Sequence, residues 1–319
     1  MSWIRRGGGD LGFRLTTGSF AFLLVSAVFA IGVVLSLESM LSIRQFGLNF
    51  WRTSTWDPVS GEFGALPFIW GTLYSSILAL LISTPIALGI AIFLTETSPT
   101  WLRTPLTFLT ELLAAIPSIV YGLWGVFVLV PLVRSAQTSM PDWMRALPIF
   151  SGPPVGVSML AAALILAVMV VPYTSSVARE VLKSVPAAQR EGAYALGATR
   201  WEATKVALHY ARTGIIGAIM LGFGRALGET MAVTMVIGNT PKVSWSLFSP
   251  QYTMAAVIAN EFSEAVEELH LHALVEIGLV LFIITLIVNG MSRVLIWSMG
   301  RSAKAVPVTS PTQPAAAQA

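Results

Sequence analysis

The sequence predicts an all-α, polytopic membrane protein with six transmembrane helices. Its 319 residues are 55% hydrophobic and only 11% charged, whereas about 25% of the residues of soluble globular proteins are charged. The mean hydropathy of +0.75 agrees with the membrane class. A hydrocarbon core needs roughly 20 apolar residues to cross it. Four runs without a charged side chain are long enough, namely 15–37, 63–95, 112–133 and 146–178.

Two further spans contain or adjoin charges. The fifth covers about 213–238 and is interrupted by Arg225 and Glu229, and the sixth covers about 272–297. The apolar runs are continuous rather than alternating, which favours helices over the strands of a membrane barrel. The first run lacks a small-residue cleavage site, so we expect a retained helix rather than a signal peptide.

Basic residues outside the spans predict the orientation. One side holds only Arg44, Arg52, Arg134, Arg145 and Lys242, and the other basic residues outside the spans flank the opposite side. Because Lys and Arg gather on the cytoplasmic side of membrane proteins, we expect both termini in the cytoplasm.

The chain is expected to have three regions. They are a cytoplasmic N-terminus (1–17), a transmembrane domain (18–300) and a disordered cytoplasmic tail (301–319) rich in Ala, Pro, Thr and Gln. Within the domain we expect helices at about 18–37, 67–94, 109–133, 156–178, 213–238 and 272–297, with a cytoplasmic loop at 184–212.

Composition also excludes several kinds of site. The absence of cysteine excludes disulfides, iron–sulfur clusters and thiolate metal sites. Three histidines are too few to favour a His-rich metal site, so we expect neither a metal nor a cofactor. The net charge of +3 and the pI of about 9.4 are attributed to the orienting Lys and Arg. The expected surroundings are membrane lipid, and nucleic acid is not an expected partner.

The outward segment 240–271 is acidic. Glu261, Glu264, Glu267 and Glu268 form either a solvated loop, as charge runs usually do, or a docking surface for an external partner. Residues 252–260 within this segment predict a short apolar helix, either interfacial or re-entrant.

The loop 184–212 predicts two short helices joined at a glycine. Pro186 suits the first turn of a helix, and Gly197 suits the left-handed residue that stops it. Thr199 with Glu202 three residues later fits a capping box that starts the second helix. Small side chains around Glu191 would let a partner's surface approach closely, although an amphipathic helix without a partner fits the same pattern.

Glu191-Gly192-Ala193 followed by Gly197 resembles the EAA loop of ABC-importer permeases. The family pattern is Glu-Ala-Ala, three residues, Gly, and later a Leu-Pro ending. Here Gly192 replaces the middle alanine, and Leu208 is followed by His209-Tyr210 instead of proline. In that family the loop sits in a cleft of the ATP-binding subunit. The resemblance implies that the ATPase-coupling residues are Arg190, Glu191, Gly192, Ala193, Tyr194 and Gly197.

Three further stretches are similar to the phosphate-specific (Pst) permeases. They are 111–122, 224–239 (GRALGETMAVTMVIGN) and 252–262, and the MAVTM continuation is similar to the PstC-type subunits. This resemblance implies a type I ABC-importer permease (MetI-like) fold in the bacterial inner membrane. It also implies a PstA-like second permease, two PstB-like ATP-binding subunits and a PstS-like external phosphate-binding protein as partners.

The charges inside the fifth span are the candidate substrate site. Each alone would cost about 2.5–3.5 kcal/mol at mid-membrane, and Arg225 and Glu229, four residues apart, would share a helix face and pair. Intramembrane charges usually mark a pathway, so we expect Arg225, Glu229 and the neighbouring Thr230 to meet an anion. A polar staple between helices is the alternative.

Two weaker candidates flank the predicted kink at Pro117. Ser118 and Tyr121 lie close to this proline and could line the same path, but ordinary helix packing explains them as well.

The sequence therefore predicts the permease subunit of an ATP-driven inorganic phosphate importer. No G-x-x-x-x-G-K-[ST] motif occurs in the chain, so we expect no catalytic residue and ATP hydrolysis by separate subunits. A permease for another oxyanion, such as phosphonate or molybdate, is one alternative. A self-contained ion-coupled transporter is another.

Overall fold

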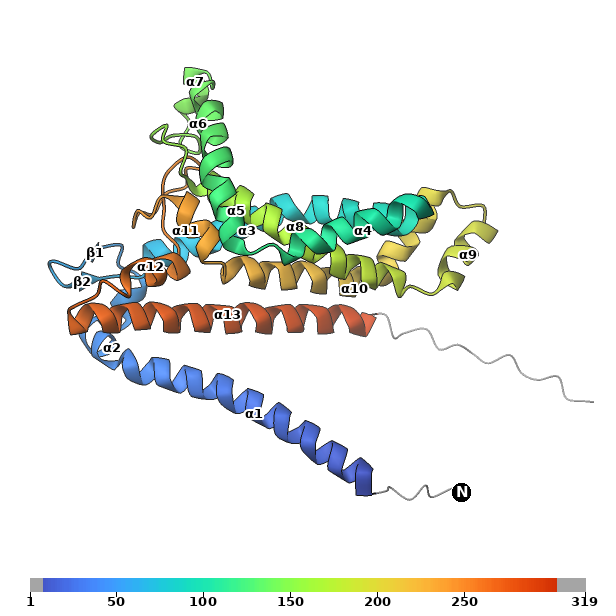
Figure 1. Ribbon diagram of the computed structural model, residues 1–319, viewed down its shortest axis with the longest axis horizontal. Helices are drawn as coiled ribbons and strands as arrows, with labels where there is room; N and C mark the ends of the chain where they lie inside the picture. The colour runs from blue at the N-terminus through green and yellow to red at the C-terminus, as the bar shows by residue number, and fades with distance from the viewer. Residues whose placement is uncertain (1–7, 303–319) are drawn as a thin grey trace, which may run out of the picture. The chain divides into compact units, whose positions relative to one another are not determined.

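The computed structural model describes residues 8–302 and is built almost entirely from helices (Figure 1). Within these residues there are thirteen α-helices and one short antiparallel hairpin, in which Trp56 pairs with Phe63. The predicted tail 301–319 lies almost wholly outside the described residues, as do residues 1–7 of the predicted N-terminus. Residues 8–17 belong to the first helix, α1 (Gly8–Glu38).

Six helical segments are long and apolar enough to cross a membrane, which confirms the predicted number. They are Leu11–Glu38, Leu66–Thr97, Ser118–Thr138, Met159–Lys183, Arg200–Leu227 and Glu268–Met299.

The chain divides into two compact units, each made of three chain segments. Unit 1 comprises residues up to Leu78, Pro117–Leu166 and Leu227–Thr285, and unit 2 comprises Ala79–Ile116, Ala167–Ala226 and the residues from Leu286. Three long helices each contribute several residues to both units, namely α3 (Leu66–Ile92), α8 (Met159–Lys183) and α13 (Glu268–Ser302), and Leu227, the last residue of α10 (Arg200–Leu227), belongs to unit 1.

Unit 1 contains most of the short elements. Besides α1 they are α2 (Met40–Phe46), the 3₁₀ turn η1 (Gly47–Trp51), β1 (Trp56–Asp57), β2 (Glu62–Phe63), α5 (Ser118–Trp124), the π-helical segment η3 (Gly125–Leu129), α6 (Val130–Thr138), α7 (Asp142–Arg145), α11 (Met231–Ile237) and α12 (Met254–Glu261).

The core of unit 1 is aromatic. The ring of Trp56 packs edge-on against Phe63 and Phe68, with 4.8 Å between ring centroids in each pair. His270 stacks on Phe63 at 5.2 Å. Glu261 accepts a hydrogen bond from Trp56 Nε1 at 2.9 Å, and its carboxylate lies 3.3 Å from His270 Nε2. The hairpin is thus held to α12 and α13 by both apolar and polar contacts.

The acidic segment after α12 is divided in its environment. Glu261 is turned into the aromatic core, whereas Glu264, Glu267 and Glu268 are exposed. Exposure of these three matches the solvated loop, and docking of an external partner there stays a prediction.

The short helix predicted at 252–260 forms as α12 (Met254–Glu261), and its first turn is buried. Thr253 Oγ1 caps it by accepting from the backbone N–H of Ala256 at 3.3 Å, and the first turn from Met254 is enclosed. Burial raises the pKa of the Tyr252 phenol to about 12, and its oxygen accepts from Asn260 Nδ2 at 3.0 Å. The segment is therefore part of the core of unit 1.

Gly71 allows α3 to approach the chain just before α12. A Cβ at this position would overlap the backbone carbonyl oxygen of Tyr252. We expect Gly71→Ala to destabilise the protein by about 3 kcal/mol, the upper end of overpacking costs, because backbone cannot rotate away as a side chain can. Thermal unfolding of the detergent-solubilised chain measures this. Gly89→Ala in the same helix is the control, since nothing lies within 4 Å of its Cβ position. Equal melting temperatures for the two variants would contradict the prediction.

Unit 2 packs through small residues. Its own elements are the π-helical segment η2 (Phe93–Thr97), α4 (Thr100–Ala115), α9 (Ala187–Ala195) and α10 (Arg200–Leu227). Cβ atoms at Gly214 and Gly222 of α10 would collide with Val181 and Thr174 of α8, and Ala218 between them is fully buried. This stripe with a spacing of four lets two membrane helices approach closely.

Two predicted spans are interrupted by helix breaks. The span predicted at 109–133 is wrong in its bounds, because α4 ends at Ala115 and α5 starts at Ser118 after Pro117, whose ring prevents a continuous helix. The span predicted at 213–238 is also wrong, because α10 ends at Leu227 and a separate helix starts at Met231.

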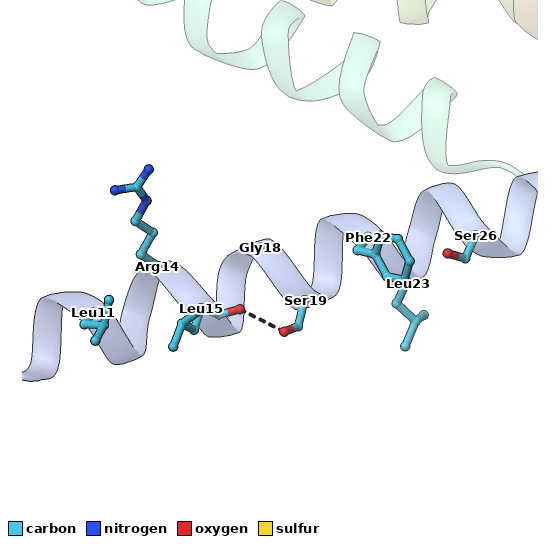
Figure 2. A pocket seen from close by; sticks show the side chains of 8 residues that line it. All are labelled: Leu11, Arg14, Leu15, Gly18, Ser19, Phe22, Leu23 and Ser26. Carbon is cyan, nitrogen blue, oxygen red and sulfur yellow. Dashed lines mark hydrogen bonds between the residues drawn. The ribbon is translucent and has the colours of Figure 1, made fainter.

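Helix α1 is exposed along most of its length. Its C-terminal part contacts α13, where a Cβ at Gly32 would lie 3.1 Å from the ring of Phe282. Towards the N-terminus, one face carries a shallow hollow (Figure 2) lined by Leu11, Arg14, Leu15, Gly18, Ser19, Phe22, Leu23 and Ser26. Their spacing of three and four residues places them on one side of the helix.

Candidate functional site

The loop 184–212 begins as predicted. Helix α9 follows Pro186, and Gly197, with φ of +81°, adopts the left-handed conformation that ends the helical segment. Glu202 Oε2 accepts from the backbone N–H of Thr199 at 2.8 Å, and the backbone N–H of Glu202 donates to Thr199 Oγ1 at 3.4 Å. This reciprocal pair is the capping box predicted for the start of the next helix.

The second helix of the loop is not short. Helix α10 runs without interruption from Arg200 to Leu227, so the loop continues directly into the fifth span. The physical reason is that Leu208 is followed by His209-Tyr210, and not by the proline of the EAA-type pattern. Without proline, every backbone N–H there can stay in the helical ladder. A displacement at the start of α10 therefore passes along one continuous helix.

Helix α9 has an exposed face and an anchored face. Glu191, Gly192 and Tyr194 are exposed, and Leu196 just after the helix is 91% exposed. Ala193 is half-buried. These residues form an outer surface with two small residues, Gly192 and Ala193, two larger apolar side chains and a single carboxylate.

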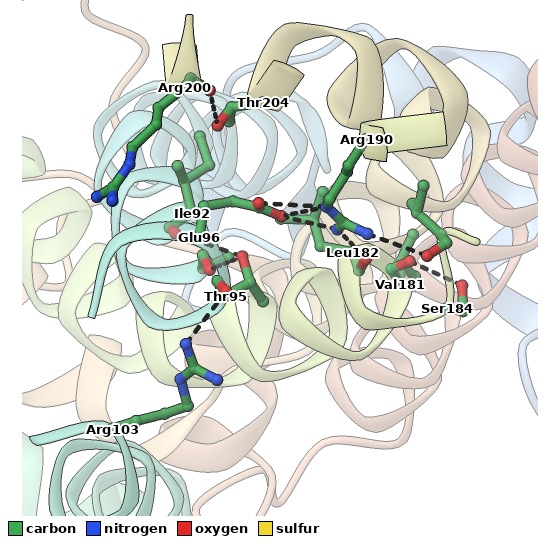
Figure 3. Close-up of polar contacts among 12 residues, drawn as sticks. Ile92, Thr95, Glu96, Arg103, Val181, Leu182, Ser184, Arg190, Arg200 and Thr204 are labelled. Carbon is green, nitrogen blue, oxygen red and sulfur yellow. Dashed lines mark hydrogen bonds and ion pairs between the residues drawn. The ribbon is translucent and has the colours of Figure 1, made fainter. Parts of the chain in front are cut away.

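Arg190 lies on the anchored face of α9. Its Nε donates to both carboxylate oxygens of Glu96 at 3.2 Å, and Nη2 donates to Oε1 at 2.7 Å (Figure 3). Its Nη1 also donates to the carbonyl of Val185, and Nη2 to that of Leu182, both at 3.0 Å. Arg190 thus connects α9 with η2, which directly follows α3, and with the end of α8.

The turn after α9 allows a test of whether the left-handed backbone conformation of Gly197 stabilises α9. We expect Gly197→Ala to destabilise the helical state of α9 by roughly 1 kcal/mol, because a Cβ is disfavoured at positive φ; nothing else lies within 4 Å of that Cβ position. Amide hydrogen exchange in α9 should accelerate roughly fivefold. Gly192→Ala, which is helical and has open space around its Cβ position, should slow exchange instead. Equal exchange rates in the two variants would contradict this account.

Arg225 ends the apolar part of α10 with an exposed guanidinium. Its guanidinium carbon lies 5.8 Å from the ring centroid of Tyr173 on α8. Among the described residues of unit 2, no carboxylate forms an ion pair with it. The charge is thus held beside an aromatic ring and remains open to an anion.

Glu229 and Thr230 lie in the break between α10 and α11. Glu229 Oε1 accepts a hydrogen bond at 3.5 Å from the backbone N–H of Ala232, in the first turn of α11. Thr230 Oγ1 donates to the carbonyl of Gly228 at 3.4 Å. The predicted placement of Arg225 and Glu229 on one helix face is wrong, because the helix ends between them. Irregular backbone at membrane depth is tolerated where it is buried in protein or lines a water-filled cavity.

Ser118 and Tyr121 belong to α5, which packs against α11. A Cβ at Gly122 would lie 3.1 Å from Cα of Ala232, and a Cβ at Gly125 would lie 2.8 Å from Val236. Ser118 is the first residue of α5, and Thr230 directly precedes α11. Tyr121 is buried, which favours a packing role.

Sequence reasoning missed Glu96 and Tyr173. Glu96 is the first charged residue after the apolar run 63–95. An acidic side chain at this position indicates only that the membrane span has ended. Tyr173 follows Pro172 inside an apolar run and carries no charge. Neither has a local signal, because each partner is distant in the chain.

The family model described as binding-protein-dependent transport system inner membrane component matches residues 85–299. Phosphate transport system permease protein PstC of Pasteurella multocida is 49% identical over 293 residues, covering 90% of this chain and 91% of the relative. The protein of the same name from Haemophilus influenzae is 47% identical, with coverage of 90% and 93%.

A solved structure supports the fold. A chain of the methionine ABC transporter MetNI, in an inward-facing conformation, has a TM-score of 0.55 and 16% identity, covering 73% of this chain and 94% of that chain. The similarity confirms the expected MetI-like fold. Together with the sequence matches, it assigns the chain to the binding-protein-dependent inner-membrane transport components and, among these, to the PstC group of phosphate transport permeases.

Proposed function

We propose that this multi-pass membrane protein carries inorganic phosphate as one permease subunit of an ATP-driven importer. The observation that carries this proposal is Arg225, a cation with an exposed guanidinium on a membrane-spanning helix that ends two residues later. A planar guanidinium matches the oxygens of a tetrahedral oxyanion. A charge on a membrane-spanning helix is costly, so stability does not explain Arg225 and a role in the anion path explains it better.

Glu229 and Thr230 are proposed to act on the same anion. The carboxylate of Glu229 can compete with phosphate for Arg225, so that the anion is bound without being trapped. It can also accept a hydrogen bond from a protonated phosphate oxygen, which sulfate lacks near neutral pH. The Thr230 hydroxyl is a further donor in the irregular segment. Ser118, and less directly Tyr121, extend this path along α5.

The outer surface of α9 is proposed to dock an ATP-binding subunit. The docking residues are Glu191, Gly192, Ala193 and Tyr194, and Gly197 shapes the turn that follows. Arg190 has a different role, because its guanidinium is engaged inside unit 2. The complete importer would contain a PstA-like permease, two PstB-like ATPases and a PstS-like external phosphate-binding protein. This chain itself has no nucleotide-binding motif, so hydrolysis belongs to the ATPases.

Co-expression with these subunits and reconstitution into liposomes tests the function. We expect ATP-dependent uptake of radiolabelled phosphate that excess unlabelled phosphate suppresses. Suppression by molybdate or phosphonate, with no phosphate uptake, would identify another oxyanion as the substrate. Uptake driven by an ion gradient in liposomes containing this chain alone would contradict ATP-driven import.

A further inference from the structure

We infer that the Glu96–Arg190 ion pair is the joint through which displacement of α9 reaches α3 and α8. The inference rests on the proposed docking of an ATPase on the outer surface of α9. It assigns a positioning role to Glu96 and moves Arg190 from the docking surface to the connection behind it.

The geometry of the pair is restrictive. All three guanidinium nitrogens of Arg190 are engaged, two of them with Glu96 and two with the carbonyls of Leu182 and Val185. The last carbonyls of a helix have no partner within the helix, so Arg190 also caps α8. One side chain of α9 therefore holds two other helix ends in fixed directions. A bidentate Arg–carboxylate contact fixes orientation as well as distance.

The burial of the pair argues against a purely stabilising role. The side chains of Arg190 and Glu96 are 21% and 13% exposed. The other ion pairs of unit 2 each include a partner that is about half exposed or more, such as Glu111 at 56% and Glu180 at 61%. Replacing a buried ion pair with apolar residues often leaves stability unchanged or raises it. Directional contact is what the ion pair adds.

Glu96 belongs to η2, the segment that directly follows α3. Residues Phe93–Thr97 form a π-helical turn, a local geometry often found at functional positions. Arg103 of α4 donates to the carbonyls of Thr95 and Ser98 on either side of Glu96, at 3.4 and 3.2 Å (Figure 3). A pull on Glu96 therefore acts on a turn that is also tied to α4.

The apolar surroundings make the joint stiff. Leu182 and Val185, whose carbonyls bind Arg190, are buried with Ala91 of α3 and Ala207 of α10 in one core cluster. A close-packed cluster transmits displacement with little compression. The outer face of α9 remains exposed, so a partner that displaces α9 exerts force on the Glu96–Arg190 ion pair.

The test uses the complete importer in liposomes, with two measurements for each variant. The first is the amount of ATPase subunit recovered with the permease, and the second is the phosphate transported per ATP hydrolysed. In Glu96→Gln and Arg190→Gln we expect recovery close to that of the unmodified complex and about tenfold less transport per ATP, within the range typical of coupling between sites. Arg190→Lys keeps the charge but not the planar fork, so it should fall between.

Asp142→Asn provides a matched control, because it removes an ion pair with Arg145 in which the carboxylate is 95% exposed. Its transport per ATP should be unchanged. If the single variants do not accumulate in the membrane, the double variant Glu96→Leu/Arg190→Met is measured in their place, since it leaves no buried charge without a partner. Unchanged transport per ATP in that double variant, or in Glu96→Gln, would overturn the inference. Loss of the ATPase subunit from Arg190→Gln would instead place Arg190 in the docking surface and equally overturn it. If the unmodified chain recovers no ATPase, the proposed function fails first and this inference with it.

Discussion

Arg225→Gln is expected to abolish phosphate uptake while the assembled importer still hydrolyses ATP. Glutamine keeps a hydrogen-bond donor but removes the positive charge that an anion meets in α10. Removing one member of a desolvated charge interaction costs about 2–5 kcal/mol, which corresponds to a loss of roughly 30-fold or more in rate or affinity. Uptake of radiolabelled phosphate into liposomes measures the loss, and ATP hydrolysis in the same preparation shows that the complex is intact.

Two variants separate charge from folding in this experiment. Arg225→Lys keeps the charge without the planar fork and should retain intermediate uptake. Arg293→Gln removes an exposed arginine from another membrane helix of unit 2 and should leave uptake unchanged. Normal uptake in Arg225→Gln would exclude Arg225 from the path. Loss of assembly in that variant would make Arg225 a structural staple, and the stacking on Tyr173 would then be its main role.

The number of spans and the local shape of the loop could be predicted because their causes are local. A charge-free run of sufficient length is stable only as a membrane helix, whatever surrounds it. Gly197 and the Thr199–Glu202 box act within a few residues of themselves, and both appear in the structure as expected. The MetI-like fold followed from short motifs that, taken together, are specific.

The break after Leu227 could not be predicted from periodicity. Residues on both sides of it are apolar, so 213–238 reads as one span of suitable length. Gly224 and Gly228 lower helix propensity by about 1 kcal/mol each, but glycines are common in membrane helices and do not by themselves end one. The start of α11 depends on the Glu229 carboxylate and on close packing with α5 at Gly122, and that packing is a tertiary contact.

The orientation of Arg190 was hidden for the same reason. Its partner Glu96 lies 94 residues earlier in the chain. The motif makes Arg190 and Glu191 look like one functional unit, because they are adjacent and of opposite charge. On a helix, however, neighbours point about 100° apart, so one can face the protein while the other faces a partner. The structure separates them in this way, which allows the two residues to be tested independently.

Glu191→Lys is expected to release the ATPase subunit from the permease. Glu191 is the exposed carboxylate of α9, and reversing its charge both removes an acceptor and introduces repulsion towards a basic partner group. A central interface residue contributes about 2 kcal/mol or more, so affinity should fall roughly 30-fold. The measurement is the amount of ATPase recovered when the permease is purified through a tag on this chain, compared with the unmodified protein.

The structure predicts a specific pattern among neighbouring variants. Glu191→Gln retains an acceptor and should keep part of the binding, whereas Glu264→Lys reverses an exposed glutamate of unit 1 and should keep all of it. Arg190→Gln should retain the ATPase, because the Arg190 guanidinium is engaged with Glu96 inside unit 2. Unchanged recovery with Glu191→Lys would remove α9 from the interface. Equal loss from Arg190→Gln and Glu191→Lys would mean that the helix docks as a whole, and the division of α9 into an outer and an anchored face would be wrong.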